Sequence, residues 1–323
     1  MIDFRYHLVS LVSVFLALAV GIVLGAGPLR ENLGDQLTKQ VDALRKEKDD
    51  LRVQNATKDA SIEHRDDFIT AFTPQLVAGE LTNRTVAVIR TPGVEDTTVD
   101  AVVATLGAAG GTVTARVELT EAWTDPERRA AREQVAAQLE GGVSDGVAGD
   151  DSQARLDALL ARALLSGAPP GPDPVDDAAR AVLTGLDTND LVNFDGEVTS
   201  LADTALVLVP GVPEATGQQA DPQPSGQDVD PSRDFATLAR ALDSYGGTVV
   251  SGPASSATTD GLVAAVRDDD AAVREVSTID SGTTPMGDVA AVLALRQQAE
   301  GRTGHYGFGD GATAPAPDAA SAS

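Results

Sequence analysis

The sequence predicts an α/β protein in which an N-terminal transmembrane helix and a coiled-coil stalk precede a globular α/β domain. Three observations carry this prediction. An uncharged apolar run occupies residues 8–26, heptad-spaced apolar residues follow it, and from residue 79 short β-branched runs alternate with helical segments up to residue 300. The period of the apolar residues therefore changes from helical to mixed along the chain.

The apolar run Leu8–Ala26 is nineteen residues long and contains no charge. At 1.5 Å per residue, such a helix covers a hydrocarbon core of ~30 Å. A buried core helix and a signal peptide cleaved near Gly25-Ala26-Gly27 are the alternatives. The run is longer than the apolar part of most signal peptides, so we interpret residues 1–27 as a retained, single-pass membrane anchor.

Small residues recur at every fourth position of this anchor, at Ala17, Gly21 and Gly25. On a helix they share one face, and the small-xxx-small pattern allows two membrane helices to approach closely. We interpret these three residues as a transmembrane dimer face. The alternative is compositional, since glycine and alanine are common in membrane helices.

Residues 28–78 are polar and favour helix, with apolar residues on a heptad that predicts a parallel, dimeric coiled-coil stalk. An asparagine at an a position of such a seam fixes register at some cost in stability. The alternative is a single amphipathic helix that folds back on the globular domain. The predicted seam consists of Leu37, Val41, Leu44, Leu51, Asn55, Ile62, Ile69 and Phe72.

Residues 79–300 read as strands that are each followed by a helix, which predicts a doubly wound, mostly parallel sheet of Rossmann-like or flavodoxin-like type. Residues 211–232 are too polar and too rich in proline and glycine to pack, so they predict a mobile loop. Residues 301–323 form a tail rich in glycine, alanine and proline. We expect strands at 85–89, 112–117, 205–209, 248–250 and 275–278, and helices at 96–109, 126–140, 153–166, 176–186, 234–244, 260–267 and 285–300.

Three predicted strands end in proline and glycine, at Thr91-Pro92-Gly93, Pro210-Gly211 and Ser251-Gly252-Pro253. Ligands of open α/β sheets bind at the carboxyl ends of strands, so these ends are candidates to line a crevice. Tight strand exits need turn residues in any case, and this simpler interpretation stays open. The ligand of such a crevice is not specified by the sequence.

Catalytic and metal-binding patterns are missing from the sequence. There is no phosphate-binding glycine motif, and no histidine or lysine lies between residues 85 and 300. The chain has no cysteine, two methionines and three histidines, without convergent spacing. We therefore expect no enzyme activity, no catalytic residue, no cofactor and no metal site. A net charge of −25 also disfavours nucleic acid as a partner.

Two terminal motifs carry a resemblance. The opening, Met1–Leu11 (MIDFRYHLVSL), and the ending, Gly304–Ala312 (GHYGFGDGA), are similar to those of the actinobacterial MctB-type family, catalogued as copper transport proteins. The resemblance implies a cell-envelope protein in copper homeostasis or efflux, with its bulk outside the cytoplasm. Copper as a ligand follows from this resemblance alone. His305-Tyr306 is a candidate copper site, and a packed aromatic that anchors the tail is the preferred interpretation.

Two functional hypotheses follow. The resemblance implies a membrane-anchored, non-enzymatic component of copper transport. Some family members are instead viewed as SteB-like partners of a second membrane protein in septation and cell-wall remodelling, which suggests a dimeric scaffold that does not handle copper itself. Charges beside the anchor leave its topology open, because nearby cations favour a cytoplasmic stalk whereas long domains translocate largely regardless of them.

Overall fold

The computed structural model describes residues 4–26, 28–143, 149–167, 173–213 and 231–318. The chain divides into two compact units, Met1–Arg65 and Asp66–Ser323. Each unit is described by itself. The α-helices are α1 (Phe4–Ala26), α2 (Pro28–Leu76), α3 (Asp96–Ala108), α4 (Arg129–Glu140), α5 (Ser152–Leu164), α6 (Asp177–Thr188), α7 (Pro231–Asp243), α8 (Leu262–Asp268), α9 (Ala272–Glu275) and α10 (Pro285–Ala299).

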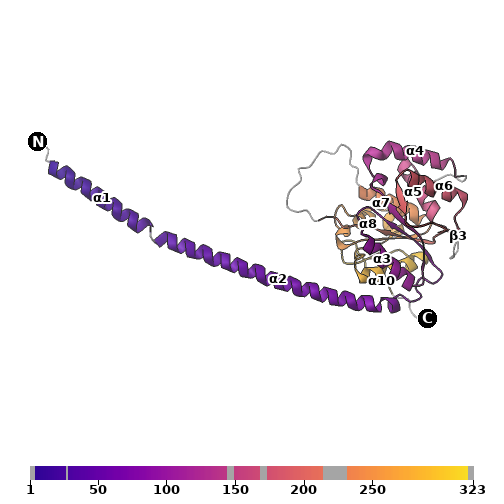
Figure 1. The fold of residues 1–323 in the computed structure, drawn as a ribbon, viewed down its shortest axis with the longest axis horizontal. Coiled ribbons are helices and arrows are strands. Elements are labelled where there is room, and N and C mark those ends of the chain that lie inside the picture. The colour runs from indigo at the N-terminus through magenta and orange to yellow at the C-terminus, as the bar shows by residue number, and fades with distance from the viewer. Residues whose placement is uncertain (1–3, 27, 144–148, 168–172, 214–230, 319–323) are drawn as a thin grey trace. The chain divides into compact units, whose positions relative to one another are not determined.

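The first unit consists of α1 and the greater part of α2, which Figure 1 shows as two long helices at the indigo end of the chain. The helix predicted from residue 28 to about residue 72 is confirmed as the 49-residue α2, which begins at Pro28. Proline suits the first turn of a helix, where its missing N–H group would have no partner. Within the described residues, α1 is the one helix long and apolar enough to cross a membrane.

The second unit is built on a central sheet. Its strands, with those of a small two-stranded sheet (β3, β5), are β1 (Thr85–Arg90), β2 (Thr112–Leu119), β3 (Asp173–Pro174), β4 (Val192–Phe194), β5 (Ser200–Leu201), β6 (Thr204–Leu208), β7 (Gly247–Ser251), β8 (Ser277–Ile279) and β9 (His305–Tyr306). In the described chain, the order is β4-β2-β1-β6-β7-β8-β9. The pairs are parallel except β2–β4, which confirms the predicted mostly parallel sheet.

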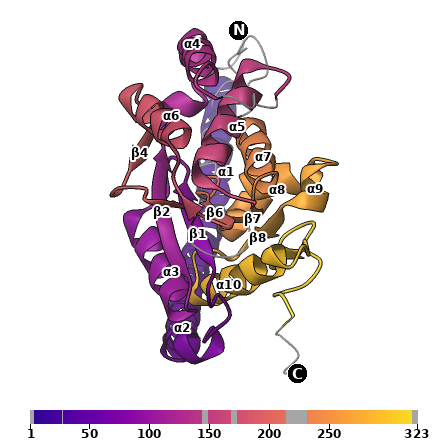
Figure 2. The same ribbon diagram turned by 90° about the vertical axis from the view of Figure 1, so that its right-hand side faces the viewer.

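Helices cover both faces of this sheet, as Figure 2 shows. Along β1, Val86 and Val88 face the layer that contains α3 and α10, whereas Ala87 and Ile89 face the layer that contains α5 and α7. All four side chains are buried, which is why the strand reads as a continuous apolar run. The sheet is therefore the middle of three layers.

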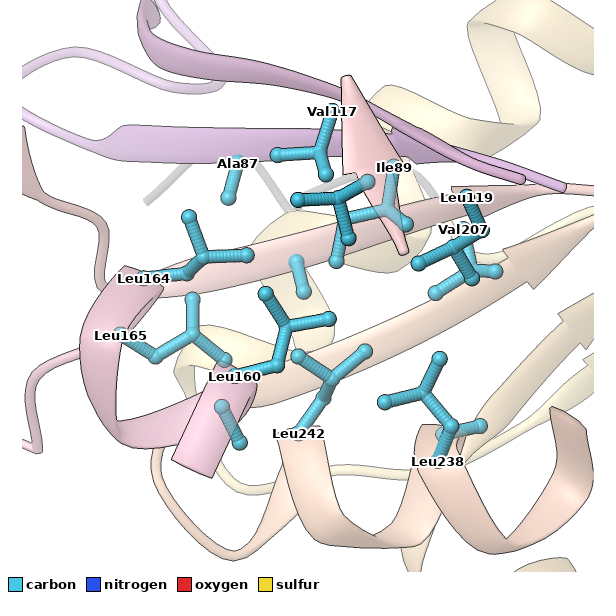
Figure 3. Packing of buried hydrophobic residues seen from close by; sticks show 14 of the residues in the cluster. Ala87, Ile89, Val117, Leu119, Leu160, Leu164, Leu165, Val207, Leu238 and Leu242 are labelled. Carbon is cyan, nitrogen blue, oxygen red and sulfur yellow. The ribbon is translucent and has the colours of Figure 1, made fainter. Parts of the chain in front are cut away.

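The larger core lies between the sheet and the layer of α5, α7 and α8. Figure 3 shows Leu160 and Leu164 of α5 and Leu238 and Leu242 of α7 packed toward Ile89 and Val207. Each of these side chains is at most 1% exposed. Burial of one leucine stabilises a fold by about 1.5–3 kcal/mol, so this layer supplies much of the stability of the second unit.

The structure adds elements that the sequence pattern does not reveal. β4 closes one edge antiparallel to β2, and β9 adds a strand at the other edge, from the segment assigned to the tail. The strand expected at 275–278 is β8 (Ser277–Ile279), because the chain up to Glu275 turns as α9. Most of the predicted mobile loop, residues 214–230, lies outside the described residues. The described chain resumes at Pro231, the first residue of α7.

Candidate functional site

The chain leaves two neighbouring strands in opposite directions. After β1 it forms α3 on one face of the sheet, and after β6 it forms α7 on the other face. Where such connections diverge, the carboxyl ends of the two strands border a crevice that is not filled by a helix. The gap between the ends of β1 and β6 is therefore the expected place for a ligand.

A cavity of about 480 Å³ lies at this point, and we call it the switch-point pocket. It unites Thr91-Pro92 and Pro210-Gly211, two of the three proline–glycine strand exits. The third exit lies beside Gly211, because a Cβ added to this glycine would come within 3.0 Å of Pro253. The described lining is Thr91, Pro92, Glu121, Thr124, Asp125, Pro126, Pro210, Gly211, Val212, Pro213, Phe235, Asp260, Gly261 and Leu262.

Much of this lining comes from segments that sequence patterns did not connect with the crevice. Residues 121–126 follow β2, Phe235 lies on α7, and Asp260–Leu262 lead into α8. These segments meet only because the sheet brings their strands together. The signals that were available are the proline at residue 126 and the position of Phe235 on the apolar face of α7, where it is 8% exposed.

A buried polar network fixes the wall that follows β2. The Arg132 guanidinium donates hydrogen bonds to the backbone oxygens of Ala122 (2.9 Å) and Asp125 (2.6 Å). Its Nε donates to the side-chain oxygen of Gln153 at 3.0 Å, and Gln153 donates in turn to Asp157 at 3.0 Å. Arg132 is only 6% exposed, so its side chain is directed into the protein and stabilises the backbone of this wall.

Asp157 lies at the end of this network and is fully buried. Burial raises the pKa of its carboxyl well above the usual value, because the charged form loses its hydration. The side chains of Gln153 and Trp123 oppose this rise, because both stabilise the charged form of the Asp157 carboxyl. Trp123 is itself fully buried and lies between Glu121 and Thr124 in the pocket wall, so its indole is an internal reporter of that wall.

The ending of the chain is fixed by a buried ion pair. Asp280 contacts Arg267 at 2.9 Å, with side-chain exposures of 0% and 3%. The same carboxylate accepts hydrogen bonds from the backbone N–H groups of Phe308 (2.7 Å) and Gly309 (3.0 Å). A side chain at Gly307 would overlap the Asp280 carboxylate, and its φ of 130° is unfavourable for other residues. The glycines of this segment therefore have a packing role.

His305 and Tyr306 are packed into the fold. His305 is 7% exposed, and its two ring nitrogens lie 2.9 Å from the Thr278 hydroxyl and 2.9 Å from the Val273 carbonyl oxygen. Burial lowers the pKa of the imidazole. The Tyr306 hydroxyl donates to Gln297. With both nitrogens engaged, the ring offers no free donor for copper. Within the described residues, no three His, Asp or Glu side chains are grouped as metal ligands.

The predicted dimer faces lie on the first unit and on the end of α2. Ala17, Gly21 and Gly25 lie on α1, and a Cβ added to either glycine would meet no atom within 4 Å. Along α2, the predicted seam is largely exposed in the single chain, with Leu44 at 63% and Leu51 at 52%. Within the described residues, the two glycines of α1 and most of the seam of α2 are therefore exposed. The remaining seam residues on α2 are Leu37, Val41, Asn55, Ile62, Ile69 and Phe72.

The fold and the site define a class: an α/β protein with an apolar N-terminal helix, a long polar helix and a pocket at the carboxyl edge of its sheet. Residues 1–317 match the family described as "Copper transport outer membrane protein, MctB", so the chain belongs to the MctB family and the suspected resemblance is confirmed.

Named relatives agree with this assignment over nearly the whole chain. Proteins named "Copper transporter MctB" from Mycobacterium tuberculosis and Mycobacterium bovis are 31% identical over 316 residues, which covers 97% of this chain and 98% of theirs. A protein of the same name from Mycobacterium leprae is 32% identical over 331 residues. The similarity extends through both units and the pocket-forming segments.

Proposed function

We propose that this protein is a non-enzymatic, membrane-anchored component of copper homeostasis in the cell envelope. We further propose that two copies pair through α1 and α2 to form a rod, called the paired rod, and that this rod presents the second unit, called the α/β head, to a partner. The single observation that carries the pairing is the exposed apolar seam of α2. The names of its relatives support the connection with copper.

The anchor and its orientation are part of the proposal. The 22-residue apolar stretch Phe4–Gly25 supports a single membrane span, with the bulk of the chain outside the cytoplasm. An apolar helix exposed along its length is stable in lipid and unfavourable in water. Among the described residues, a Cβ added to Gly21 or Gly25 of α1 meets no atom within 4 Å, which supports a second helix beside this face.

Pairing of α2 would remove its apolar seam from water. Seam side chains such as Leu44, Leu51 and Ile62 are exposed in the single chain, which is costly for a helix that is otherwise polar. In a parallel dimer these side chains would pack against their copies, with Asn55 specifying the register. We therefore propose a coiled coil, with a dimer as the working unit.

The chemistry of the chain supports an indirect role in copper handling. Copper(I) favours thiolate, thioether and imidazole ligands, whereas this chain has no cysteine and has an imidazole, His305, that is engaged on both sides. We propose that copper is moved or sensed by a partner to which this protein docks. The strand order β2-β1-β6-β7-β8 also supports a flavodoxin-like, doubly wound head, a fold that places binding sites at the carboxyl edge of the sheet.

The second candidate is a scaffold for a membrane partner in septation and cell-wall remodelling, without a role in copper. The same exposed seam favours it, together with the absence of cysteine and of convergent methionine or histidine spacing in the sequence. The two candidates share the paired rod and differ in the phenotype of a strain that lacks the gene. Cellular copper would rise in the first case, whereas septa would be defective at unchanged copper in the second.

The experiment combines these readouts. A deletion strain is complemented with the wild type, with Leu44→Asn/Leu51→Asn, or with Val53→Asn, whose side chain is 67% exposed on α2 outside the seam. We expect the wild type and Val53→Asn to cross-link as dimers in membranes and to restore normal copper content. The seam variant should do neither. Normal copper content in the uncomplemented deletion strain would contradict the role in copper homeostasis.

A further inference from the structure

We propose that two copies of this chain also meet at the C-terminal end of α2, where a row of exposed apolar side chains packs against the same row of the second copy. This row, called the aromatic stripe, consists of Phe68, Phe72 and Leu76. Because the stripe belongs to α2, the contact rests on the pairing of α2 proposed above. It adds the residues that pair in the second unit and the way in which the two α/β heads are held together.

Exposed apolar side chains of the second unit gather at this helix end. Among the described residues of the unit, four large hydrophobic side chains are exposed. Three of them form the stripe, with Phe68 at 63%, Phe72 at 42% and Leu76 at 54%, and the fourth is Phe308. A single exposed hydrophobic residue is ordinary, whereas a contiguous group marks a contact surface. The stripe is contiguous, because the ring centroids of Phe68 and Phe72 lie 4.6 Å apart.

The next row of side chains on α2 packs on the α/β head. Residues four apart lie on one side of a helix, so Ile69, Thr73 and Val77 form a row beside the stripe. Ile69 is partly buried, Thr73 is 8% exposed, and Val77 is fully buried in the core that includes α3 and α10. The heptad places Ile69 in the seam, but its row is turned toward the α/β head. We therefore assign Phe68, in place of Ile69, to the contact between copies.

The end of α2 is fixed to the α/β head, so the stripe has one orientation on it. Glu80 forms a salt bridge with Arg296 of α10. The backbone N–H of Leu81 donates a hydrogen bond to the carbonyl oxygen of Ala109 at 3.0 Å, and the Leu81 side chain is fully buried. A surface that is ordered before contact loses less free energy on association. Packing of the stripe against its copy would therefore also fix the two α/β heads relative to each other.

Charge and continuity favour a second copy as the occupant of the stripe. Two copies that each carry a net charge of −25 repel one another wherever their acidic surfaces approach. Residues 68–79 carry no charge, so this stretch brings no like charges together when two copies meet. Phe72 is also part of the predicted seam, so the stripe continues that seam toward the α/β head. About a two-fold axis each side chain meets its own copy, and a row of phenylalanine and leucine is complementary to itself.

Single cysteines test the contact, because the chain has no cysteine of its own. The full chain in detergent micelles carries Phe68→Cys, Leu44→Cys or Thr70→Cys and is treated with a short bismaleimide. Thr70 is exposed and two residues from both phenylalanines, which places it on the opposite side of α2 from the stripe. We expect Phe68→Cys and Leu44→Cys to cross-link as dimers, and Thr70→Cys to remain monomeric.

Substitutions of the stripe measure its share of the pairing. Phe68→Ser/Phe72→Ser should raise the dissociation constant of the dimer by about tenfold or more, because aromatic side chains at the centre of an interface are frequent hot spots. Phe308→Ser removes an equally exposed ring, at 69%, outside the stripe and should leave the dissociation constant unchanged. Analytical ultracentrifugation in micelles measures both values. The emission of the buried Trp123 shows whether the α/β head of each variant is folded.

Equal cross-linking of Phe68→Cys and Thr70→Cys would overturn the contact, as would a serine pair that dissociates no more readily than Phe308→Ser. A dimer through Leu44→Cys without one through Phe68→Cys supports the paired rod and removes the stripe from it. Without a dimer through either cysteine, the pairing itself is wrong. In native membranes, cross-linking of Phe68→Cys to a different protein and not to its copy would assign the stripe to that protein and overturn the contact between copies.

Discussion

At the scale of single residues, the second unit depends on charges that are removed from water. Asp280 illustrates this, because it joins Arg267 to two backbone N–H groups of the segment after β9. Transfer of a carboxylate into the interior is costly unless each lone pair finds a donor. The arrangement therefore fixes the course of the chain after residue 304 more than it adds stability.

The first prediction concerns this pair. Asp280→Asn should lower the free energy of unfolding by about 3–5 kcal/mol, because it leaves the buried Arg267 without a counter-charge. Urea denaturation followed by Trp123 emission measures the effect. Asp310→Asn is the matched control, since its side chain is exposed and only its backbone oxygen contacts Arg267. Equal stability of the two variants would contradict the role of the ion pair.

At the scale of elements, α3, α7 and α10 each bury one face against the sheet, and packing of the helices removes a few acidic side chains from water. Asp288 lies in the first turn of α10, and burial raises the pKa of its carboxyl to about 7. Burial likewise raises the pKa of Asp243, in the last turn of α7, to about 6. Both groups bind protons more tightly in the folded chain than in the unfolded chain.

The second prediction follows from the sign of this shift. Because the folded state holds the Asp288 proton up to about pH 7, stability should decline between pH 4 and pH 7 and stay low above it. Asp288→Asn should remove this loss, with unfolding free energy about 1–3 kcal/mol higher at pH 8 and little changed at pH 4. Thermal unfolding across this range tests it, with the exposed Asp187→Asn as control. A gain of the same size at both pH values would contradict the mechanism.

At the scale of the whole molecule, the apolar helix α1 and the acidic remainder of the chain are stable in different environments. Residues 8–26 of α1 carry no charge and are stable in lipid, whereas a chain with a net charge of −25 needs water around its remainder. A single anchor with the bulk of the chain on one side of the membrane satisfies both. Which side this is depends on cellular insertion, because the charges beside α1 do not decide it.

The third prediction addresses this orientation. The chain contains no cysteine, so Thr188→Cys, at the exposed end of α6, introduces a single reactive thiol. We expect a membrane-impermeant maleimide to label Thr188→Cys in intact cells. Phe4→Cys, at the N-terminal end of the anchor, should react only after the cells are opened. The reverse pattern would place the head in the cytoplasm and would contradict an envelope function.

Strong local patterns predicted most of the fold. β1, β6 and β7 are buried on both faces and read as apolar runs, and α2 has a long helix-favouring composition. β4 and β9 could not be predicted, because each is two or three residues long and depends on a neighbour for every hydrogen bond. In the candidate site, Pro92 and Pro210 were predictable as strand ends, whereas Glu121 and Asp260 were not.

Local sequence patterns specify the order of the elements: an apolar helix, a polar helix with an exposed seam, and alternating strands and helices with buried strand interiors. These follow from periodicity and length, which are properties of neighbouring residues. The tertiary structure alone decided that segments after β1, β2 and β6 enclose one pocket, and that Asp280 meets Arg267 beneath the chain's ending. Such contacts depend on strand order and on desolvation. Both involve residues far apart in the chain, so local sequence patterns do not predict them.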